Sequence, residues 1–189
     1  TLEMNIPFMY LSRRQATDSG GFGKFAGGMA PEMVYMIYSG QNLKVSSYRH
    51  SRRTPANWGL FGGYPGGVND ALLVLGSKVR DWFHDSRAPT ELKDAGLLGG
   101  DILNPIGANI PMRPVNNFDL LFVRLGAGGG YGDPLDRDPE AVLHDIKRKA
   151  VSVETAAQVY GVIVDGNMKI DMPATTARRQ AIIDERLTA

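Results

Sequence analysis

The stretch GAGGGYGDPLDRDPE, residues 126–140, marks the change from a β-like part of the chain to a helical part. Glycine occupies most of its first seven positions: Gly126, Gly128, Gly129, Gly130 and Gly132. Such a density indicates a backbone that needs positive φ or the close approach of another group. Two Asp-Pro pairs follow, and each combines a good helix N-cap with a residue preset for the first helical position. We therefore interpret the stretch as the junction between a β part and an α part.

This junction divides the chain into a β-rich body, residues 1–132, and a small, mostly helical C-terminal appendage with a small hairpin, residues 133–189. With 189 residues, the chain is long enough for one domain with a substantial core. Its 23 glycines and 11 prolines favour a body rich in loops and strands over a helical bundle. The predicted fold class is α+β, a β-rich body with glycine-rich loops and the helical appendage.

Apolar or alternating runs predict strands in the body, at residues 5–17, 31–39, 43–51, 71–75 and 118–125. The glycine-containing link at residues 40–42 is short enough to join the second and third strands in a hairpin. The fourth strand is expected to run toward Trp82. Three prolines make residues 103–114 irregular or edge-like.

Three helices are predicted in the appendage, at residues 138–149, 152–160 and 173–187. Ser152 can cap the second helix, and Pro173 is suited to open the third. Between them, Asp165-Gly166 is a favoured turn for a tiny hairpin.

Composition excludes several classes of protein. A net charge of +1 gives no overall basic field for nucleic acid and no acidic tail for a charged partner. The chain has no cysteine, so disulfides and thiolate metal sites are excluded, and a reducing, cytoplasmic location fits. No apolar run approaches the roughly 20 residues needed to span a bilayer. The chain begins at Thr1, which suggests either a processed start or a fragment of a longer protein.

The glycine run also suggests a phosphate-binding loop, because glycine amides before a helix can cradle an anion. The run has no Gly-Lys-Ser/Thr ending, however, and the carboxylate of Asp133 would repel a phosphate. A tight bend that re-aims the chain is the favoured interpretation. Tyr131, the one large side chain in the run, is a candidate to face a binding site.

A basic cluster, Arg49, His50, Arg52 and Arg53, lies before an apolar, glycine-rich loop that begins at Trp58. Guanidinium groups suit phosphates and carboxylates, but a solvated rim is the favoured interpretation for such a cluster. If part of it is functional, Arg52 or Arg53 is the choice, because these residues lie beside the loop. Trp58 and its neighbours are too apolar for a solvated loop and are expected to pack into the body or onto a partner.

Metal ligands and nucleophilic triads are not indicated. The three histidines, His50, His84 and His144, are far apart and none is spaced from another as zinc ligands on one helix are. The acidic residues of the junction lack the spacing of a calcium loop. Asp133 and Asp138 precede prolines, so helix capping is the favoured role for both.

Three ordered motifs resemble the hydantoinase B and 5-oxoprolinase family, which includes the large subunits of acetone and acetophenone carboxylases. Residues 126–164, from GAGGGYGDP to YGVIV, resemble its C-terminal signature. Upstream, DSGGFGKF with the following Gly27-Gly28 resembles the family's DSGGAGKxRGG element, and RRTPANWGLFGG at residues 52–63 resembles its RxxPWGLFGG element. Family subunits of this B type are much longer, so the resemblance covers only their C-terminal part.

The resemblance implies part of a hetero-oligomeric, ATP-dependent enzyme. In such systems a carbonyl is activated by phosphorylation and then carboxylated, as in ketone carboxylases, or hydrolysed, as in cyclic amide hydrolases. ATP and a divalent metal are expected for the whole complex and bound mainly by other chains, the A-type subunit and the N-terminal part of the B-type subunit. No catalytic residue is carried over, and this chain alone is expected to be inactive. Its candidates for the wall of a site are Arg52, Arg53, Trp58 and Tyr131.

A different class of function stays open. The apolar loop from Trp58 to Tyr64 would also suit a non-catalytic assembly module that docks on a larger chain. An independent enzyme is disfavoured, because no acid, base and nucleophile are brought together by the sequence.

Overall fold

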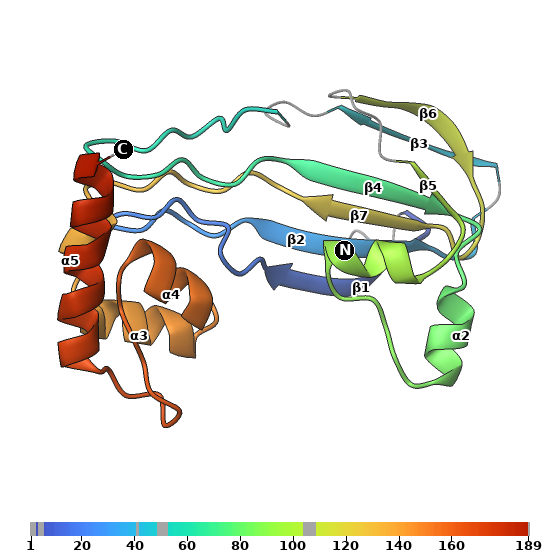
Figure 1. Cartoon of the computed structure of the whole chain (residues 1–189). Coiled ribbons are helices and arrows are strands. Elements are labelled where there is room, and N and C mark those ends of the chain that lie inside the picture. Colours follow the sequence, from blue (N-terminus) through green and yellow to red (C-terminus); the bar gives the residue numbers. More distant parts are fainter. Residues whose placement is uncertain (1–2, 4–5, 41, 49–52, 104–108, 189) are drawn as a thin grey trace. The chain divides into compact units, whose positions relative to one another are not determined.

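The structure, a computed structural model, describes residues 3, 6–40, 42–48, 53–103 and 109–188 (Figure 1). The chain forms two compact units. The sheet unit comprises Thr1–Ala16, Ala30–Ala56 and Val68–Gly126, and the helix unit comprises Thr17–Met29, Asn57–Gly67 and Ala127–Ala189. All residues from 133 onward lie in the helix unit, together with glycine-rich segments that the sequence division assigned to the β-rich body. Helices and sheets occur together, and the α+β prediction is confirmed.

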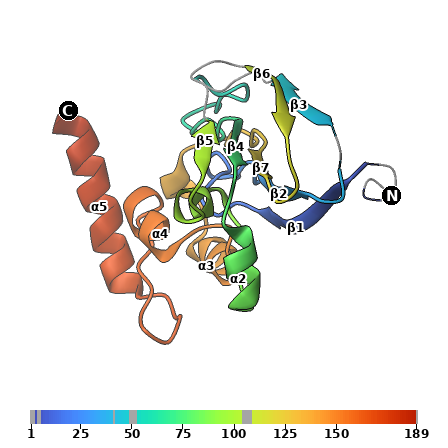
Figure 2. The same cartoon turned by 90° about the vertical axis from the view of Figure 1, so that its right-hand side faces the viewer.

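The sheet unit contains a five-stranded sheet in the order β1-β2-β7-β4-β5, and every neighbouring pair in it is antiparallel (Figures 1 and 2). Its strands are β1 Phe8–Gln15, β2 Pro31–Ile37, β4 Asp70–Leu75, β5 Asp101–Leu103 and β7 Leu120–Arg124. A second sheet pairs β3, Leu43–Tyr48, with β6, Asn109–Val115. The strands expected near residues 5–17, 71–75 and 118–125 are confirmed.

The hairpin expected between β2 and β3 is wrong. β2 pairs with β1 and β7, whereas β3 pairs with β6. The physical reason is burial: Val45 of β3 and Val115 of β6 pack with Ile37 and Leu73 of the five-stranded sheet. The β3–β6 ribbon therefore covers one face of that sheet instead of extending its edge.

One further expectation needs correction. The chain does not run toward Trp82 as a strand, because β4 ends before Gly76, which has φ +64°, and α2, Val79–His84, follows. The end of β4 is fixed where the amide of Gly76 donates to Asp119 Oδ1 at 2.7 Å. Residues 109–115 belong to the stretch expected to be irregular or edge-like, and they form β6 in a sheet of two strands, so the edge-like alternative is confirmed for them.

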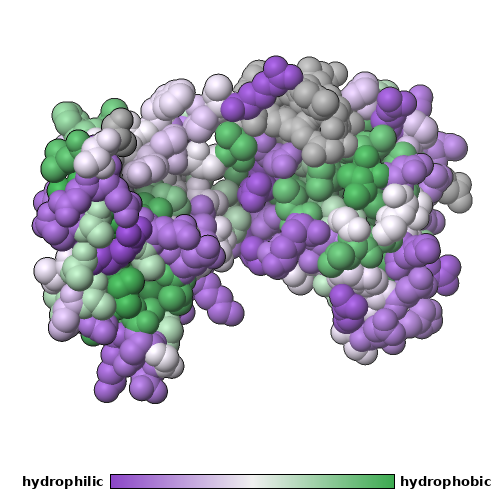
Figure 3. All heavy atoms as spheres, viewed as in Figure 1, coloured by the Kyte–Doolittle hydropathy of each residue, from purple (hydrophilic) through white to green (hydrophobic). Residues whose placement is uncertain are grey.

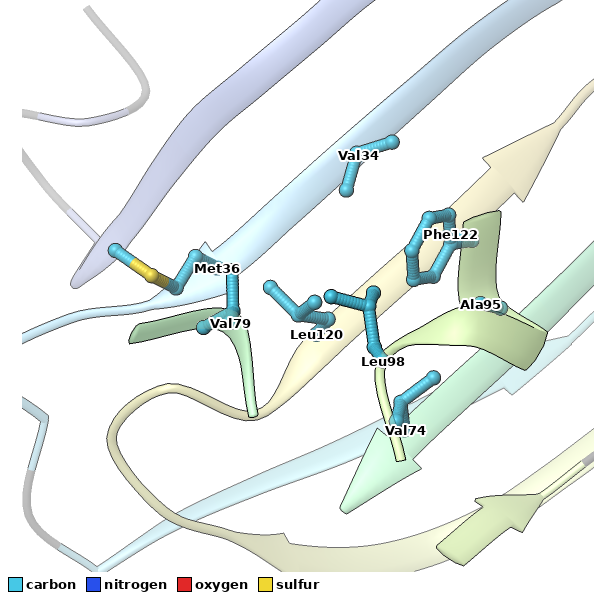
Figure 4. Packing of buried hydrophobic residues seen from close by; sticks show 8 residues of the cluster. All are labelled: Val34, Met36, Val74, Val79, Ala95, Leu98, Leu120 and Phe122. Carbon is cyan, nitrogen blue, oxygen red and sulfur yellow. The ribbon is translucent and has the colours of Figure 1, made fainter. Parts of the chain in front are cut away.

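The opposite face of the five-stranded sheet holds the main core of the sheet unit (Figure 4). Val34 and Met36 of β2 belong to this core, as do Leu120 and Phe122 of β7, and the members of each pair are two positions apart, as the period of a strand requires. Leu98 and Ala95, at the 3₁₀ helix η1, Leu92–Leu97, and Val79 of α2 cover this face. Phe122 is fully buried, and truncation of such a residue to alanine typically costs about 3–5 kcal/mol.

The helix unit contains the 3₁₀ helix η2, Pro134–Asp136, and the helices α3 Pro139–Lys147, α4 Val153–Val159 and α5 Met172–Thr188. The three helices expected from the sequence are thus confirmed. Asp138 accepts from the amide of Glu140 at 3.0 Å, and Ser152 accepts from the amide of Thr155 at 3.0 Å, so both N-caps form as the sequence predicts. The small hairpin is present as a single bridge between Val164 and Ile170.

The core of the helix unit joins α3, α4 and the chain that follows α4. It consists of Val142, Ile146, Val151, Ala156, Tyr160 and Val162. Phe22, from one of the glycine-rich segments, packs against it.

None of the helices in the described part of the chain is both long and apolar enough to cross a membrane. Hydrophobic residues nevertheless gather in patches on the visible surface of each unit (Figure 3).

Candidate functional site

The glycine run of residues 127–132 lies beside two other glycine-rich segments of the helix unit. Tyr131 forms an antiparallel bridge with Phe25 and a parallel bridge with Leu60. The amide of Phe25 donates to the carbonyl of Tyr131 at 2.9 Å, and the amide of Tyr131 donates to the carbonyl of Phe25 at 2.9 Å. On the other side, the amide of Leu60 donates to Gly130 O at 3.0 Å and the amide of Gly132 donates to Leu60 O at 2.9 Å. We call these three segments, residues 21–28, 57–67 and 127–132, the glycine ladder.

Close approach of backbones explains most of the glycines in the run. A Cβ atom at Gly129 would overlap the carbonyl oxygen of Trp58, and one at Gly130 would overlap the carbonyl oxygen of Phe22. Within the run, positive φ is confined to Gly132, at +76°. The run is therefore an extended segment packed against two neighbours, and close approach rather than a tight bend is the main reason for its glycines.

Five of the six amides of residues 127–132 are already used within the chain. They donate to carbonyl oxygens of the other ladder segments: Ala127 to Gly67, Gly128 to Gly28, Gly130 to Tyr64, Tyr131 to Phe25 and Gly132 to Leu60. A phosphate would have to replace these bonds, each of which satisfies a backbone carbonyl as well as an amide. This geometry opposes the phosphate-loop interpretation, which the sequence also disfavoured.

One face of the ladder carries a row of exposed apolar side chains. Residues paired in a bridge project their side chains to the same side, so Phe25, Tyr131 and Leu60 share a face. Their exposed fractions are 61%, 48% and 58%. Phe61 adds a fourth side chain, 76% exposed, with its ring centroid 5.1 Å from that of Tyr131. We call these four residues the Phe61 surface.

The backbone of Phe61 is strained. Its φ is +51°, in the left-handed region that bulky side chains rarely adopt. Gly62, with φ +91°, follows it, and the amide of Gly63 donates to Leu60 O at 3.0 Å to close the turn. A bulky residue in this region costs on the order of 1–3 kcal/mol, and such residues cluster at functional sites. The turn thus holds an exposed ring in place at an energetic cost.

Aromatic side chains anchor the ladder to the helical core. The Phe22 ring lies 5.8 Å from the ring of Tyr160 and 6.1 Å from the ring of Tyr64, both in edge-to-face arrangements. Burial raises the pKa of Tyr160 to about 12, so its hydroxyl stays protonated near neutral pH. Tyr160 is fully buried and belongs to the core of the helix unit.

A buried ion pair ties α3 to the ladder. Asp145 is 3% exposed, and its carboxylate contacts Arg137 Nη2 at 2.6 Å and Arg148 Nε at 3.1 Å. Arg137 Nη1 also donates to the carbonyl oxygen of Lys24, in the first ladder segment, at 2.8 Å. The guanidinium of Arg137 therefore bridges the helix and the segment that carries Phe25.

The structure brings only part of the predicted site together. Trp58 is 65% exposed and its carbonyl lies against Gly129, in the same ladder as Tyr131. Arg53 is exposed and belongs to the sheet unit, outside the ladder. Arg52 lies outside the described residues, as do Arg49 and His50.

Sequence reasoning missed Phe25, and it assigned Leu60 and Phe61 to the apolar loop of residues 58–64 without placing them on one face with Tyr131. The signal that could have found Phe25 and Phe61 is the aromatic residue that each glycine-rich segment carries between its glycines.

Acidic residues of the junction have structural partners. Asp133 accepts from the amide of Leu135 at 2.9 Å and pairs with Arg186 Nη1 at 2.6 Å, and Asp138 caps α3. The capping roles expected for both aspartates are confirmed. Within the part of the chain that the structure describes, three or more His, Cys, Asp or Glu side chains do not gather at a position that could hold a metal ion.

The motifs, the α+β fold and the glycine ladder define the class of protein to which the chain belongs. The family model described as Hydantoinase B/oxoprolinase matches residues 1–134, more than half of the chain. The chain therefore belongs to the hydantoinase B/oxoprolinase family, as the sequence motifs predicted.

Individual relatives extend the similarity to nearly the whole chain. The acetone carboxylase alpha subunit of Xanthobacter autotrophicus is 29% identical over an aligned length of 198 residues, gaps included. The alignment covers 98% of this chain and 25% of that subunit. The caprolactamase subunit beta of Pseudomonas jessenii is 30% identical and covers 95% of this chain and 27% of that subunit. A solved nucleotide-free structure of acetone carboxylase superposes with a TM-score of 0.87 at 28% identity, over 98% of this chain and 26% of that one. The chain thus spans about a quarter of the length of the relatives it matches.

Proposed function

We propose that this chain is the C-terminal part, or a small subunit equivalent to that part, of the B-type component of an ATP-dependent enzyme that activates a carbonyl by phosphorylation. The observation that carries the proposal is the TM-score of 0.87 over 98% of the chain against acetone carboxylase. Relatives that are subunits of a ketone carboxylase and of a lactamase support two outcomes for the activated carbonyl, carboxylation and hydrolysis of a cyclic amide.

Within this enzyme the chain builds a scaffold and lines one wall of the site. Trp58 and Tyr131 are the proposed wall residues of the helix unit, and Arg53 is the proposed wall residue of the sheet unit. Arg52 completes the set from the sequence, outside the described residues. The role assigned to Trp58 and Tyr131 is supported by their exposure on a ladder whose backbone is fixed by hydrogen bonds.

ATP and a divalent metal belong to the whole complex and are bound mainly by other chains, the A-type subunit and the remaining part of the B-type subunit. Support comes from the glycine run, because five of the six amides of residues 127–132 donate to carbonyls of the chain itself and leave little capacity for a phosphate. This chain alone is then inactive.

The test is reconstitution. The chain is purified with the A-type and B-type polypeptides encoded with it, and ATP hydrolysis is measured with acetone plus bicarbonate, with acetophenone plus bicarbonate, with hydantoin and with caprolactam. We expect hydrolysis of ATP that depends on one of these substrates and on the presence of the chain. A stable, monomeric chain that does not associate with either polypeptide would refute the proposal.

A non-catalytic assembly module is the second candidate, and the exposed apolar side chains of the loop at residues 58–64 favour it. The substitution Trp58→Ala separates the two roles. An intact complex that has lost turnover supports a wall residue, whereas lost association with unchanged turnover per assembled complex supports the module. Circular dichroism of the variant shows whether the fold is kept.

A further inference from the structure

We propose that the Phe61 surface, formed by Phe25, Leu60, Phe61 and Tyr131, is the surface on which the remaining part of the same B-type subunit packs. This inference rests on the proposed function, because it takes its partner from the enzyme that the chain is proposed to belong to. Beyond the proposed function, the inference identifies the contact surface on this chain, the chemistry of the partner surface and the residue that anchors the contact.

The first argument is the composition of the surface. None of its four side chains is charged, and each is at least 48% exposed. The bridges of Tyr131 to Phe25 and Leu60 place three of them on one face, and the Phe61 ring stacks at a tilt beside Tyr131. Single exposed apolar residues need no explanation, whereas a contiguous group of them marks an interaction site.

The second argument is rigidity. The backbone under the surface is held by hydrogen bonds on both sides of Tyr131, and its segments lie so close that a Cβ atom at Gly129 or Gly130 would overlap a neighbouring carbonyl oxygen. Phe61 is also kept at φ +51°. A preorganised aromatic anchor loses little conformational entropy on binding, which is the property of interface hot spots.

The third argument concerns shape and separates a protein partner from a small molecule. Sites for small ligands are concave and enclose most of the ligand. The side chains of the Phe61 surface project into solvent, with Phe61 exposed by 76%, so they cannot enclose a ligand. They are suited to insert into a pocket of another protein surface.

The fourth argument identifies the occupant. This chain corresponds to about a quarter of the acetone carboxylase alpha subunit and of the caprolactamase subunit beta, so about three quarters of such a subunit lie outside it. A contact within one subunit is permanent, and permanent interfaces are the more apolar ones. The occupant is therefore an apolar surface of that remaining part, with a pocket for Phe61 and a hydrogen-bonding group for the hydroxyl of Tyr131.

The test uses the tagged 189-residue chain, coexpressed with the polypeptide that carries the remaining hydantoinase B sequence of the same enzyme. The variant is Phe61→Asn, because asparagine tolerates the left-handed backbone and removes the ring. We expect at least tenfold less of the second polypeptide to be recovered, with a thermal midpoint close to that of the unchanged chain. The matched control is Leu97→Asn, a substitution of a 68% exposed residue in the sheet unit, which should leave recovery unchanged.

Several outcomes would overturn the inference: recovery by Phe61→Asn equal to that of the unchanged chain, an equal loss in Leu97→Asn, self-association through the Phe61 surface, or a complex that forms normally but has lost turnover. If Phe61→Asn lowers the thermal midpoint by more than a few degrees, Phe25→Ser decides by the same criteria.

ATP-dependent turnover is measured separately. A complex that needs Phe61 but lacks turnover with every substrate contradicts the proposed function and leaves the surface standing, whereas a competent complex indifferent to Phe61 contradicts only the surface.

Discussion

The ring of Phe61 lies 5.1 Å from the ring of Tyr131, although the two residues are 70 positions apart and Phe61 holds a backbone conformation that is unfavourable for its side chain. The ladder that unites them leaves no room for a side chain at Gly129, since a Cβ atom there would overlap the carbonyl oxygen of Trp58. The fold thus maintains an aromatic contact at its surface by means of glycines beneath it.

Replacement of Gly129 should therefore disrupt the fold of the helix unit. We expect Gly129→Val, and to a lesser degree Gly129→Ala, to destabilise the chain by more than about 3 kcal/mol, because the overlap forces two ladder segments apart. Urea denaturation followed by circular dichroism measures the effect. Gly96→Ala is the matched control, since a Cβ atom at Gly96 meets nothing within 4 Å. A well-folded Gly129→Val chain with weakened nucleotide affinity would restore the phosphate-cradle interpretation.

Lys149 offers a stabilising substitution. The amide of Ala150 donates to Asp145 O and the amide of Lys149 donates to Ile146 O, the pattern of a Schellman motif at the end of α3. Lys149 occupies the left-handed position of this motif, with φ +61°, where glycine is preferred. Lys149→Gly should raise the free energy of unfolding by about 0.5–1 kcal/mol, in proportion to the strain removed. Lys147→Gly, inside the same helix, should lower it, and equal effects of the two substitutions would contradict the assignment.

The ion pair between Asp145 and Arg137 should matter more than a surface pair. Asp145→Ala leaves the guanidinium of Arg137, whose side chain is 15% exposed, without its carboxylate, and loss of one partner of a buried pair typically costs about 3–5 kcal/mol. Glu154→Ala, which removes an exposed carboxylate that contacts Gln158, should cost less than about 1 kcal/mol. Thermal unfolding of both variants measures the difference. Similar midpoints would show that the Asp145 pair contributes no more than a surface contact.

Local structure was largely predictable from the sequence. The strand at Leu120–Arg124 and the helix caps at Asp138 and Ser152 depend on neighbouring residues, and these predictions were confirmed. The pairing of β2 with β1 and β7 in place of β3 was not predictable, because it depends on which faces of distant strands are buried together. The choice among alternative pairings is made by tertiary packing, which a local link such as residues 40–42 does not reveal.

The residues of the candidate site were predictable in part, whereas their arrangement on one face was not. Trp58 and Tyr131 stood out as large side chains in glycine-rich stretches, and the structure places both in one ladder. The register of that ladder could not be read from the sequence, because glycines carry no side chains and hence no alternating pattern. Without the register, Phe25 and Phe61 could not be assigned to the same face as Tyr131.

The last prediction concerns alkaline pH. Burial raises the pKa of Tyr160 to about 12 from its ordinary value of 10.0, so the folded chain holds the phenolic proton more tightly than the unfolded chain. The unfolded chain releases this proton first as pH rises, which favours unfolding, so the contribution of Tyr160 is present in full below pH 10 and is lost between about pH 10 and 12. Urea denaturation at pH 8, 10 and 11 should show stability falling across the last interval, and the fall should be shallower in Tyr160→Phe. Tyr35, whose pKa burial also raises to about 12, accounts for part of the remaining slope, and Tyr35→Phe tests it in the same way. A Tyr160→Phe chain with an unchanged slope would show that the Tyr160 hydroxyl is solvated in the folded state.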